Sequence, residues 1–289
     1  MEYDIISDML ERVECDTNEL DHVKPSRDYL GFYGLEKEPF RDSIDPTFFY
    51  RTKSHEEAYT RMMFTVEHDI SLGMIHSKSG MGKTLLSQMI LTNLNESKYF
   101  SRLILISPKM SRSGILSEIV SELGLLEQES SYHIKDMIIA IQNLAIDLYH
   151  QNKKLVLLID EAHFLTADAL HILRTLTNIE VPERKLVTCI LFAENSLAKR
   201  LKKETYDSIR SRMYHCHELR PLSEKETIQY MKYRILMSGG DEGLFTPELY
   251  KQMAEKSQGV CREVNKMCSL ALYDGFITET NPLDIDILG

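Results

Sequence analysis

The sequence contains one short segment in which glycine, lysine and threonine are spaced as phosphate binding requires. Residues 77–84 read Ser-Lys-Ser-Gly-Met-Gly-Lys-Thr. Glycines let the backbone N–H groups of such a loop approach an anion closely, and a helix that begins at the lysine adds a positive end. The segment meets the pattern G-x-x-x-x-G-K-[S/T], except that Ser77 stands at the first glycine position. We therefore predict a loop that binds the phosphates of a nucleotide.

Individual positions of this loop have expected contacts with ATP and Mg²⁺. The ammonium group of Lys83 is expected to reach the β- and γ-phosphates, which makes it a catalytic as well as a binding residue, and the hydroxyl of Thr84 to bind Mg²⁺. The predicted nucleotide-binding residues of the loop are Ser79, Gly80, Met81, Gly82, Lys83, Thr84 and Leu85. The alternative is a chance glycine turn, which the order of strand, loop and helix disfavours.

A second group of candidate residues follows an apolar run at residues 155–159. Asp160 and Glu161 come directly after this run, so they are expected at the carboxyl end of a buried strand. There Asp160 would hold the hydration shell of Mg²⁺, and Glu161 would orient and polarise the attacking water. On their own, the two acids are better explained as a solvated turn after an ordinary strand. Their place behind a phosphate loop favours ATP hydrolysis.

Strand and helix patterns alternate through the middle of the chain. Apolar runs typical of buried strands occur at residues 71–75, 103–106, 155–159 and 186–192. Helical patterns separate these runs, and another helix, expected at residues 54–69, has Ser54 as its predicted cap. This order predicts an α/β fold with a mainly parallel sheet and helices on both faces.

The pattern changes in the C-terminal part of the sequence. After Pro221, the segments at residues 223–237, 247–257 and 262–276 are helical. The predicted organisation is an N-terminal arm at residues 1–30, an ATP-binding α/β domain at residues 31–221 and a small all-helical domain at residues 222–289. The arm is inferred from its acidic and weakly periodic sequence.

Composition limits the classes of protein that this chain represents. Its 289 residues, 43% of them hydrophobic, suffice for one large domain or for a large and a small one. The five cysteines are not spaced as a zinc site or a disulfide framework, and neither a signal peptide nor a membrane-spanning run is indicated. We therefore expect a cytoplasmic protein without membrane insertion. The net charge of −10 disfavours broad, non-specific binding to nucleic acids.

Beyond the two motifs, the chain from about residue 33 to residue 276 resembles the AAA+ ATPases of the ExeA/GspA secretion-pathway type. Related ATPases include those of pilus biogenesis and the transposon target-selection ATPases of the TnsC and TniB kind. Besides the motifs, the resemblance rests on residues 33–35, 39–40, 45–46, 48–50, 55–58, 160–163, 210–212, 219–223 and 259–265. It implies a P-loop AAA+ parallel-sheet domain with a small C-terminal all-helical lid.

The resemblance also implies further site residues. The family's Gly-x-x-Arg-x-x-Asn segment falls on residues 259–265, so Arg262 is the expected arginine that contacts the nucleotide from the lid. Arg210 and Arg212 match the arginine pair offered to the ATP of a neighbouring subunit, with a solvated surface pair as the alternative for each. Where the family often has Gly-Gln-Pro, residues 193–195 are Ala-Glu-Asn, so Asn195 is the expected polar contact.

Three further groups of residues give weaker signals. His215 and His217 share one face of a strand-like segment, where core or edge histidines are a better explanation than a metal site. The basic residues at 199–203 are typical of a solvated helix face, with phosphate binding as the alternative. Lys109 and Arg112 follow a predicted strand where transposon relatives present basic residues to DNA, so DNA is a candidate partner there.

We therefore expect an enzyme that hydrolyses ATP to ADP and phosphate with Mg²⁺. The resemblance implies that ATP drives assembly into a homo-oligomeric ring or filament, and that hydrolysis assembles or remodels a protein partner in a larger machine. Secretion or pilus-type assembly of the cell envelope is the first setting. DNA transposition, with the chain as a target-selection regulator bound to DNA, is the alternative. A second alternative is a scaffold that binds ATP with little turnover, which Ser77 and Glu194 would permit.

Overall fold

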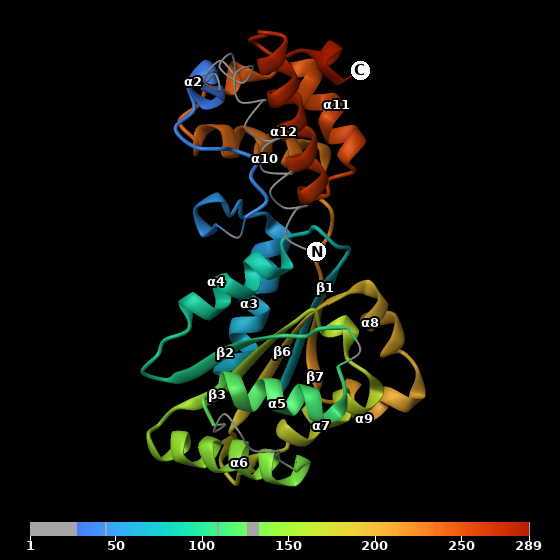
Figure 1. Ribbon diagram of the computed structural model, residues 1–289. Coiled ribbons are helices and arrows are strands. Elements are labelled where there is room, and N and C mark those ends of the chain that lie inside the picture. Colours follow the sequence, from blue (N-terminus) through green and yellow to red (C-terminus); the bar gives the residue numbers. More distant parts are fainter. Residues whose placement is uncertain (1–27, 44, 109, 126–132, 289) are drawn as a thin grey trace, which may run out of the picture.

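The structure is a computed structural model that describes residues 28–43, 45–108, 110–125 and 133–288 (Figure 1). The predicted N-terminal arm lies outside the described residues as far as residue 27, and so does Lys109. Within the described ranges, no helix is long and apolar enough to cross a bilayer.

A five-stranded parallel sheet forms the centre of the fold, in the order β2-β3-β6-β1-β7. Its strands are β1 (Leu72–Ser77), β2 (Tyr99–Leu105), β3 (Lys154–Asp160), β6 (Val187–Glu194) and β7 (Met213–Glu218). The parallel order confirms the predicted α/β fold class. The edge strand β7 contains His215 and His217, the residues of the strand-like segment.

The apolar sequence of β3 explains its place inside the sheet. All seven of its residues are buried, because helices cover both faces of a parallel sheet. Leu155, Leu157 and Ile159 belong to one hydrophobic cluster, whereas Val156 and Leu158 belong to another, as the alternation of a strand requires. The edge strand β2 begins at Tyr99, before the predicted residue 103, because its half-buried first residues interrupt the apolar pattern.

Helices cover the two faces of the sheet. One face carries α3 (Lys53–Glu67) and α4 (Lys83–Asn93), and the other carries α5 (Arg112–Glu122), α6 (Ile134–His150) and α7 (Ala167–Leu176) (Figure 1). Shorter elements are α8 (Asn195–Arg200), α9 (Asp207–Arg210), the strands β4 (Glu180–Val181) and β5 (Arg184–Lys185), and the 3-10 turns η1 (Pro46–Phe48), η2 (Ala162–Phe164), η3 (Glu204–Tyr206), η4 (Glu242–Leu244) and η5 (Ile285–Leu288). The two helical layers confirm the predicted arrangement.

The start of α3 differs from the prediction. The sequence predicts Ser54 as the cap of this helix, but the structure has Thr52 in that position. The Thr52 side chain accepts a hydrogen bond from the backbone N–H of His55, and the Ser54 hydroxyl accepts one from the backbone N–H of Arg220. Serine and threonine both suit a helix cap. Ser54 differs from Thr52 in its contact with Arg220. Because Arg220 is remote in sequence, the local sequence pattern does not reveal this contact.

The C-terminal helices build a second hydrophobic core. They are α10 (Glu224–Leu236), α11 (Pro247–Ser257) and α12 (Cys261–Ile277). The short helix α2 (Tyr29–Tyr33) lies beside them, blue next to orange and red in Figure 1, and Tyr33, Leu35 and Phe40 share their hydrophobic cluster. The chain therefore passes through this helical layer before it enters the sheet. The boundaries at residues 30 and 221 stay predictions.

The carboxyl ends of three neighbouring strands meet at one edge of the sheet. In the pairing of β1 with β6, Ser77 lies opposite Glu194. On the other side of β6, β3 runs parallel to it and ends at Asp160. Ligands of open parallel sheets bind outside this edge. The loop at residues 78–82, which connects β1 to α4, is therefore placed where a ligand is expected.

Candidate nucleotide site

The loop between β1 and α4 has a backbone conformation that depends on its glycines. Gly80 and Gly82 have φ angles of 76° and 83°, in the left-handed region that favours glycine. Among the described residues, no hydrogen-bond acceptor serves the backbone N–H groups of residues 80–85. Unpaired donors at the start of a helix are the groups that bind a phosphate anion. The loop thus has the donors that its sequence predicts.

Helix α12 touches this loop directly. The backbone N–H of Arg262 donates a hydrogen bond to the carbonyl oxygen of Gly80 at 3.1 Å. A Cβ atom on Gly80 would lie 2.7 Å from the Cβ atom of Arg262, which is closer than real Cβ atoms approach. A side chain at residue 80 would therefore force the helix and the loop apart.

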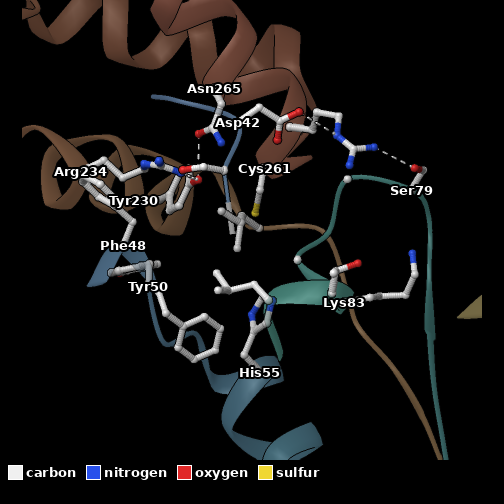
Figure 2. A pocket seen from close by; sticks show the side chains of 18 of the residues that line it. Asp42, Phe48, Tyr50, His55, Ser79, Lys83, Tyr230, Arg234, Cys261 and Asn265 are labelled. Carbon is white, nitrogen blue, oxygen red and sulfur yellow. Dashed lines mark hydrogen bonds and ion pairs between the residues drawn. The ribbon is translucent and has the colours of Figure 1, made fainter. Parts of the chain in front are cut away.

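A cavity of about 350 Å³ lies where the loop, the end of β3 and α12 meet (Figure 2). The predicted site residues that line it are Ser79, Gly80, Gly82, Lys83, Thr84, Leu85, Glu161 and Arg262. Its other lining residues include the apolar and aromatic side chains of Phe48, Phe49, Tyr50, Leu222, Tyr230 and Cys261. Met81 and Asp160 are buried and do not line it. The cavity therefore combines a loop of phosphate-binding type with apolar walls that suit a nucleobase.

Lys83 is buried, with 6% of its surface exposed, and its ammonium group is held by the loop itself. Nζ donates to the Ser77 hydroxyl at 3.4 Å and to the Lys78 carbonyl at 3.1 Å. Burial lowers the pKa of Lys83, an effect that the negative charges of Glu161, Glu194 and Asp160 oppose. Ser77, the departure from the glycine pattern, thus supplies an additional contact for the lysine.

Asp160 and Glu161 have different surroundings although they are adjacent. One oxygen of the buried Asp160 carboxylate accepts from the backbone N–H of Glu161 at 2.8 Å, and Oδ2 has no partner in the described part of the chain. Glu161 lines the cavity and has a φ angle of 55°, which is uncommon for a residue with a side chain. Its carboxylate lies 3.4 Å from Nδ1 of His163. Of the five residues other than glycine with a positive φ angle among the described ones, Glu161 is the one that lines the cavity.

Arg262 reaches the loop with its side chain as well as its backbone. Its Nη1 donates to the hydroxyl of Ser79 at 3.1 Å, and its Nε lies 3.7 Å from a carboxylate oxygen of Asp42. Arg262 also lines the cavity, together with Ser79 and Asp42. The structure therefore brings the predicted lid arginine beside the predicted phosphate loop.

Asn195 stands at the carboxyl end of β6 but does not line the cavity. Its Oδ1 accepts from Nδ1 of His76 at 2.7 Å, and its Nδ2 donates to Glu218 at 3.4 Å. The side chain thus bridges the ends of β1 and β7. A contact between Asn195 and phosphate stays a prediction.

Arg210 and Arg212 lie away from the cavity and contact their own surroundings. Arg210 forms an ion pair with Asp207 and donates to the carbonyl oxygens of Leu201 and Lys202. Arg212 donates to Asn178 Oδ1 at 3.0 Å and to the carbonyl oxygen of Ser208 at 2.7 Å. Neither arginine lines the cavity of its own chain. Their role toward a neighbouring subunit stays a prediction.

The weaker candidates also have definite places. Arg112 begins α5, and its guanidinium lies 3.2 Å from the carboxylate of Asp168. The Nε2 atoms of His215 and His217 are buried without a hydrogen-bond partner among the described residues, and the ring of Phe64 packs edge-on against His215. Within those same residues, no group of three side chains is arranged to hold a metal ion.

His55 is a residue of the site to which the sequence analysis gave no role. It is 4% exposed, and its Nε2 lies 3.1 Å from the carbonyl oxygen of Met81 in the phosphate loop. Its Nδ1 lies 2.7 Å from the hydroxyl of Thr52. Burial lowers the pKa of His55. The segment at residues 55–58 contributes to the family resemblance, but nothing in its spacing indicates contact with the loop.

A buried polar network at the aromatic side of the cavity was not predicted either. The guanidinium of Arg234 donates to the hydroxyl of Tyr230 at 2.8 Å and also to backbone carbonyl oxygens of Pro39 and Arg41. The Tyr230 hydroxyl donates to Asn265 Oδ1 at 2.8 Å, and burial raises its pKa to about 12. The network joins α10, α12 and the segment that follows α2. No sequence motif indicates it, because its members come from three distant segments.

Comparisons with known proteins agree with this geometry. The model of the family described as "AAA domain" matches residues 67–201, which include the phosphate loop and the end of β3. The chain is 26% identical over 248 residues to General secretion pathway protein A of Aeromonas hydrophila, a match that covers 86% of this chain. Both matches support an AAA+ ATPase of the ExeA/GspA type. It spans 45% of the length of that relative.

Solved structures support the AAA+ fold of the chain. The ORC2 protein of Aeropyrum pernix, solved in ADPNP and ADP complexes, has a TM-score of 0.64 at 16% identity, with 88% of this chain and 70% of that chain covered. Cdc6p of Pyrobaculum aerophilum has a TM-score of 0.63 at 12% identity, with coverages of 83% and 66%. A single-residue variant of Thermotoga maritima RuvB has a TM-score of 0.53 at 16% identity, with coverages of 81% and 66%. At these identities the likeness shows the fold alone.

Proposed function

We propose that this AAA+ protein binds ATP with Mg²⁺ in the cavity and hydrolyses it to ADP and phosphate. The observation that carries the proposal is the meeting of the phosphate loop, Glu161 and Arg262 at one cavity. The loop supplies hydrogen-bond donors, Glu161 supplies a carboxylate, and Arg262 supplies a cation from a helix of the second core. A site that only bound phosphate would not require the carboxylate, so this combination supports hydrolysis.

Phosphate binding rests on the loop and on Lys83. The unpaired N–H groups of residues 80–85 and the positive end of α4 favour an anion. Lys83 would exchange its contacts with Ser77 and the Lys78 carbonyl for phosphate oxygens. Hydrogen bonds between an ammonium group and a phosphate are stronger than those between neutral groups. The exchange therefore favours the bound state.

Two residues beside the loop fit a Mg²⁺ ion. Thr84, which carries a hydroxyl, lines the cavity, and the unpartnered Oδ2 of Asp160 is a buried anionic oxygen. Oxygen ligands, several of them water molecules, are those that Mg²⁺ prefers. Thr84 and Asp160 would hold the ion, which when bound neutralises phosphate charge.

Glu161 is the proposed residue that acts on water. Its side chain is about one-third exposed, at 36%, and lines the cavity that Lys83 also lines. A carboxylate in this place orients a water molecule and takes up a proton as the water attacks the γ-phosphate. Lys83 and Arg262 would stabilise the negative charge that spreads over the transferred group.

The proposal extends to assembly through Arg210 and Arg212. Both lie outside the cavity of their own chain, which agrees with delivery of an arginine to the site of a neighbouring subunit. An arginine that is supplied in trans stabilises the charge of the transition state and accelerates hydrolysis strongly. We therefore propose that the active form is a homo-oligomer. The ring or filament geometry follows from the resemblance alone.

For the biological setting, we propose secretion-type assembly of the cell envelope, with a protein partner in a larger machine. The similarity to General secretion pathway protein A supports this setting. We place the chain in the cytoplasm, where ATP is available and its four described cysteines, all free, would stay reduced. The net charge of −10 favours this setting over a role on DNA.

The proposed function is tested by ATP affinity and phosphate release of the purified chain. Lys83→Ala should weaken ATP binding by about tenfold or more, because it removes a charge-assisted contact. Lys98→Ala is the matched control, because Lys98 is an exposed lysine outside the cavity. Equal ATP affinities for the wild type and Lys83→Ala would contradict the proposal.

A further inference from the structure

His55 lies against the phosphate loop without being part of it. The residue belongs to the first turn of α3, and Figure 2 shows its ring beside the start of α4. Its two ring nitrogens contact Met81 O at 3.1 Å and Thr52 Oγ1 at 2.7 Å. The edge-on ring of Phe49 closes another side. The imidazole is therefore held in one orientation.

The two contacts determine which ring nitrogen of the neutral His55 carries the hydrogen. A backbone carbonyl oxygen only accepts, so Nε2 carries the hydrogen and donates to Met81. Nδ1 is then the acceptor, and the Thr52 hydroxyl donates to it. Burial lowers the pKa of His55; the hydrogen bond to Met81 and the charge of Glu226 in α10 oppose this effect, and His217 of β7 reinforces it. Because burial is the largest of these effects, the surroundings favour the neutral imidazole.

The hydrogen bond to Met81 also orients the next amide group. In a planar trans peptide, the carbonyl oxygen of Met81 and the N–H of Gly82 point in opposite directions. Because His55 holds the oxygen on its own side, the Gly82 N–H points away from the imidazole. That N–H is one of the loop donors without an acceptor among the described residues. Gly82 itself, with a φ angle of 83°, has little steric resistance to rotation of this peptide.

We propose that His55 is a positioning residue for nucleotide binding, which holds the Met81–Gly82 peptide so that the Gly82 N–H is available to the phosphates. In the reverse orientation the carbonyl oxygen would face the phosphates, and its partial negative charge would repel them. The inference rests on the proposed binding of ATP at this loop. It adds a residue of α3, outside the loop motif, to the groups that determine affinity.

The test compares ATP and ADP affinities of three variants in the full chain. His55→Ala should weaken both affinities by about tenfold, the effect of losing one hydrogen bond and its orientation. His55→Gln should recover most of the loss, because its side-chain amide also donates to a carbonyl oxygen. His68→Ala should bind as the wild type does, since His68 is an exposed histidine at the other end of the same helix.

Lys83→Ala separates failure of this inference from failure of the proposed function. If Lys83→Ala binds weakly while His55→Ala binds like the wild type, the function stands and the role of His55 is wrong. Equal losses in His55→Ala and His55→Gln would also overturn it, because a packing defect would then be the cause.

A measurement on the unaltered protein does not depend on how the variants fold. The ¹⁵N chemical shifts of the His55 ring in a ¹⁵N-labelled sample report which nitrogen is protonated. We expect a protonated Nε2 and an unprotonated Nδ1. The opposite tautomer would remove the hydrogen bond to Met81 and contradict the proposal.

Discussion

Arg262 and Ser79 are 183 positions apart in the sequence, yet the guanidinium of Arg262 donates to the Ser79 hydroxyl at 3.1 Å. The same guanidinium lies near the exposed carboxylate of Asp42. An exposed pair of this kind contributes little free energy, whereas a contact with phosphate is charge-assisted. A triphosphate in the cavity would therefore draw Arg262 away from Asp42. The position of α12 would in this way respond to the bound nucleotide.

The first prediction follows from this relationship. Arg262→Gln should lower ATP affinity about tenfold and leave ADP affinity nearly unchanged, because the lost charge is expected on the γ-phosphate. Titration with fluorescent ATP and ADP analogues measures both. Lys266→Gln, one turn further along α12 and exposed, is the control and should change neither. Equal losses for ATP and ADP would contradict a contact with the γ-phosphate.

The second prediction concerns the close approach of Gly80 to α12. Gly80→Ala should reduce both ATP affinity and the free energy of unfolding, since the new Cβ atom would collide with Arg262 and the φ angle of 76° is unfavourable for alanine. Gly34→Ala is the matched control. Gly34 has a φ angle of 66°, but a Cβ atom added to it would have no neighbouring atom within 4 Å.

Both glycine variants should lose about 1 to 2 kcal/mol of stability from the left-handed backbone alone. Only Gly80→Ala should lose more than this and also bind ATP weakly. Urea unfolding and nucleotide titration of the two variants provide the comparison. Equal stability losses together with unchanged ATP affinity in Gly80→Ala would show that the contact with α12 is not needed.

The third prediction concerns the neighbouring subunit. Arg212→Ala should bind ATP normally but release phosphate slowly, because an arginine delivered in trans accelerates hydrolysis by about 10³-fold or more. Mixing it with Lys83→Ala should restore activity at interfaces where an intact Arg212 faces an intact Lys83. Arg210→Ala, tested in the same way, decides which arginine acts. Two results together would contradict an arginine supplied by the neighbouring subunit. The specific activity of the wild type would not rise with protein concentration, and the mixture would show no rescue.

The fourth prediction is a pH dependence of stability that arises at the β7 edge. Burial, reinforced by the positive charge of Arg61, lowers the pKa values of His215 and His217. The unfolded chain, with histidine pKa values of about 6.5, therefore binds more protons near pH 6 than the folded chain. The two neutral histidines therefore make their full contribution to the free energy of unfolding above about pH 6.5, and this contribution is lost as the pH falls below that value.

Urea unfolding at about pH 7.5 and about pH 5.5, on either side of the ordinary histidine pKa, measures this effect. The wild type should lose free energy of unfolding on acidification, and replacing both His215 and His217 by glutamine should make the loss smaller. His150→Gln, at an exposed position in the last turn of α6, should retain the loss of the wild type. An unchanged loss in the double variant would assign the pH dependence to other groups.

Much of the fold was predictable because its signals are local. The buried strand β3 is a continuous apolar run that ends in Asp160 and Glu161, and the alternation of such runs with helical patterns predicts a parallel sheet around it. The phosphate loop is equally local, since glycines, lysine and threonine occur within one short segment. Strand ends that belong to one parallel sheet then meet at one edge without further information.

The remaining features depend on contacts between distant segments. His55 acts on Met81 through tertiary packing, and Arg234 reaches Pro39 across the helical core. The packing of Tyr33 and Leu35 among the C-terminal helices is likewise a long-range contact. The helix cap at Thr52 was missed because Ser54, an equally suitable cap by type, is engaged by the backbone of Arg220. No local pattern contains these partners.

The most direct test of ATP hydrolysis at this cavity is phosphate release by Glu161→Gln beside the wild type, with ATP affinity measured on the same samples. Glutamine keeps the shape of the side chain but neither orients water as an anion nor takes up its proton. We predict that Glu161→Gln binds ATP at least as well as the wild type and releases phosphate at least about 100-fold more slowly, within the range of about 10²–10⁴-fold expected for a lost general base. Phosphate release at the wild-type rate with ATP bound would contradict the account.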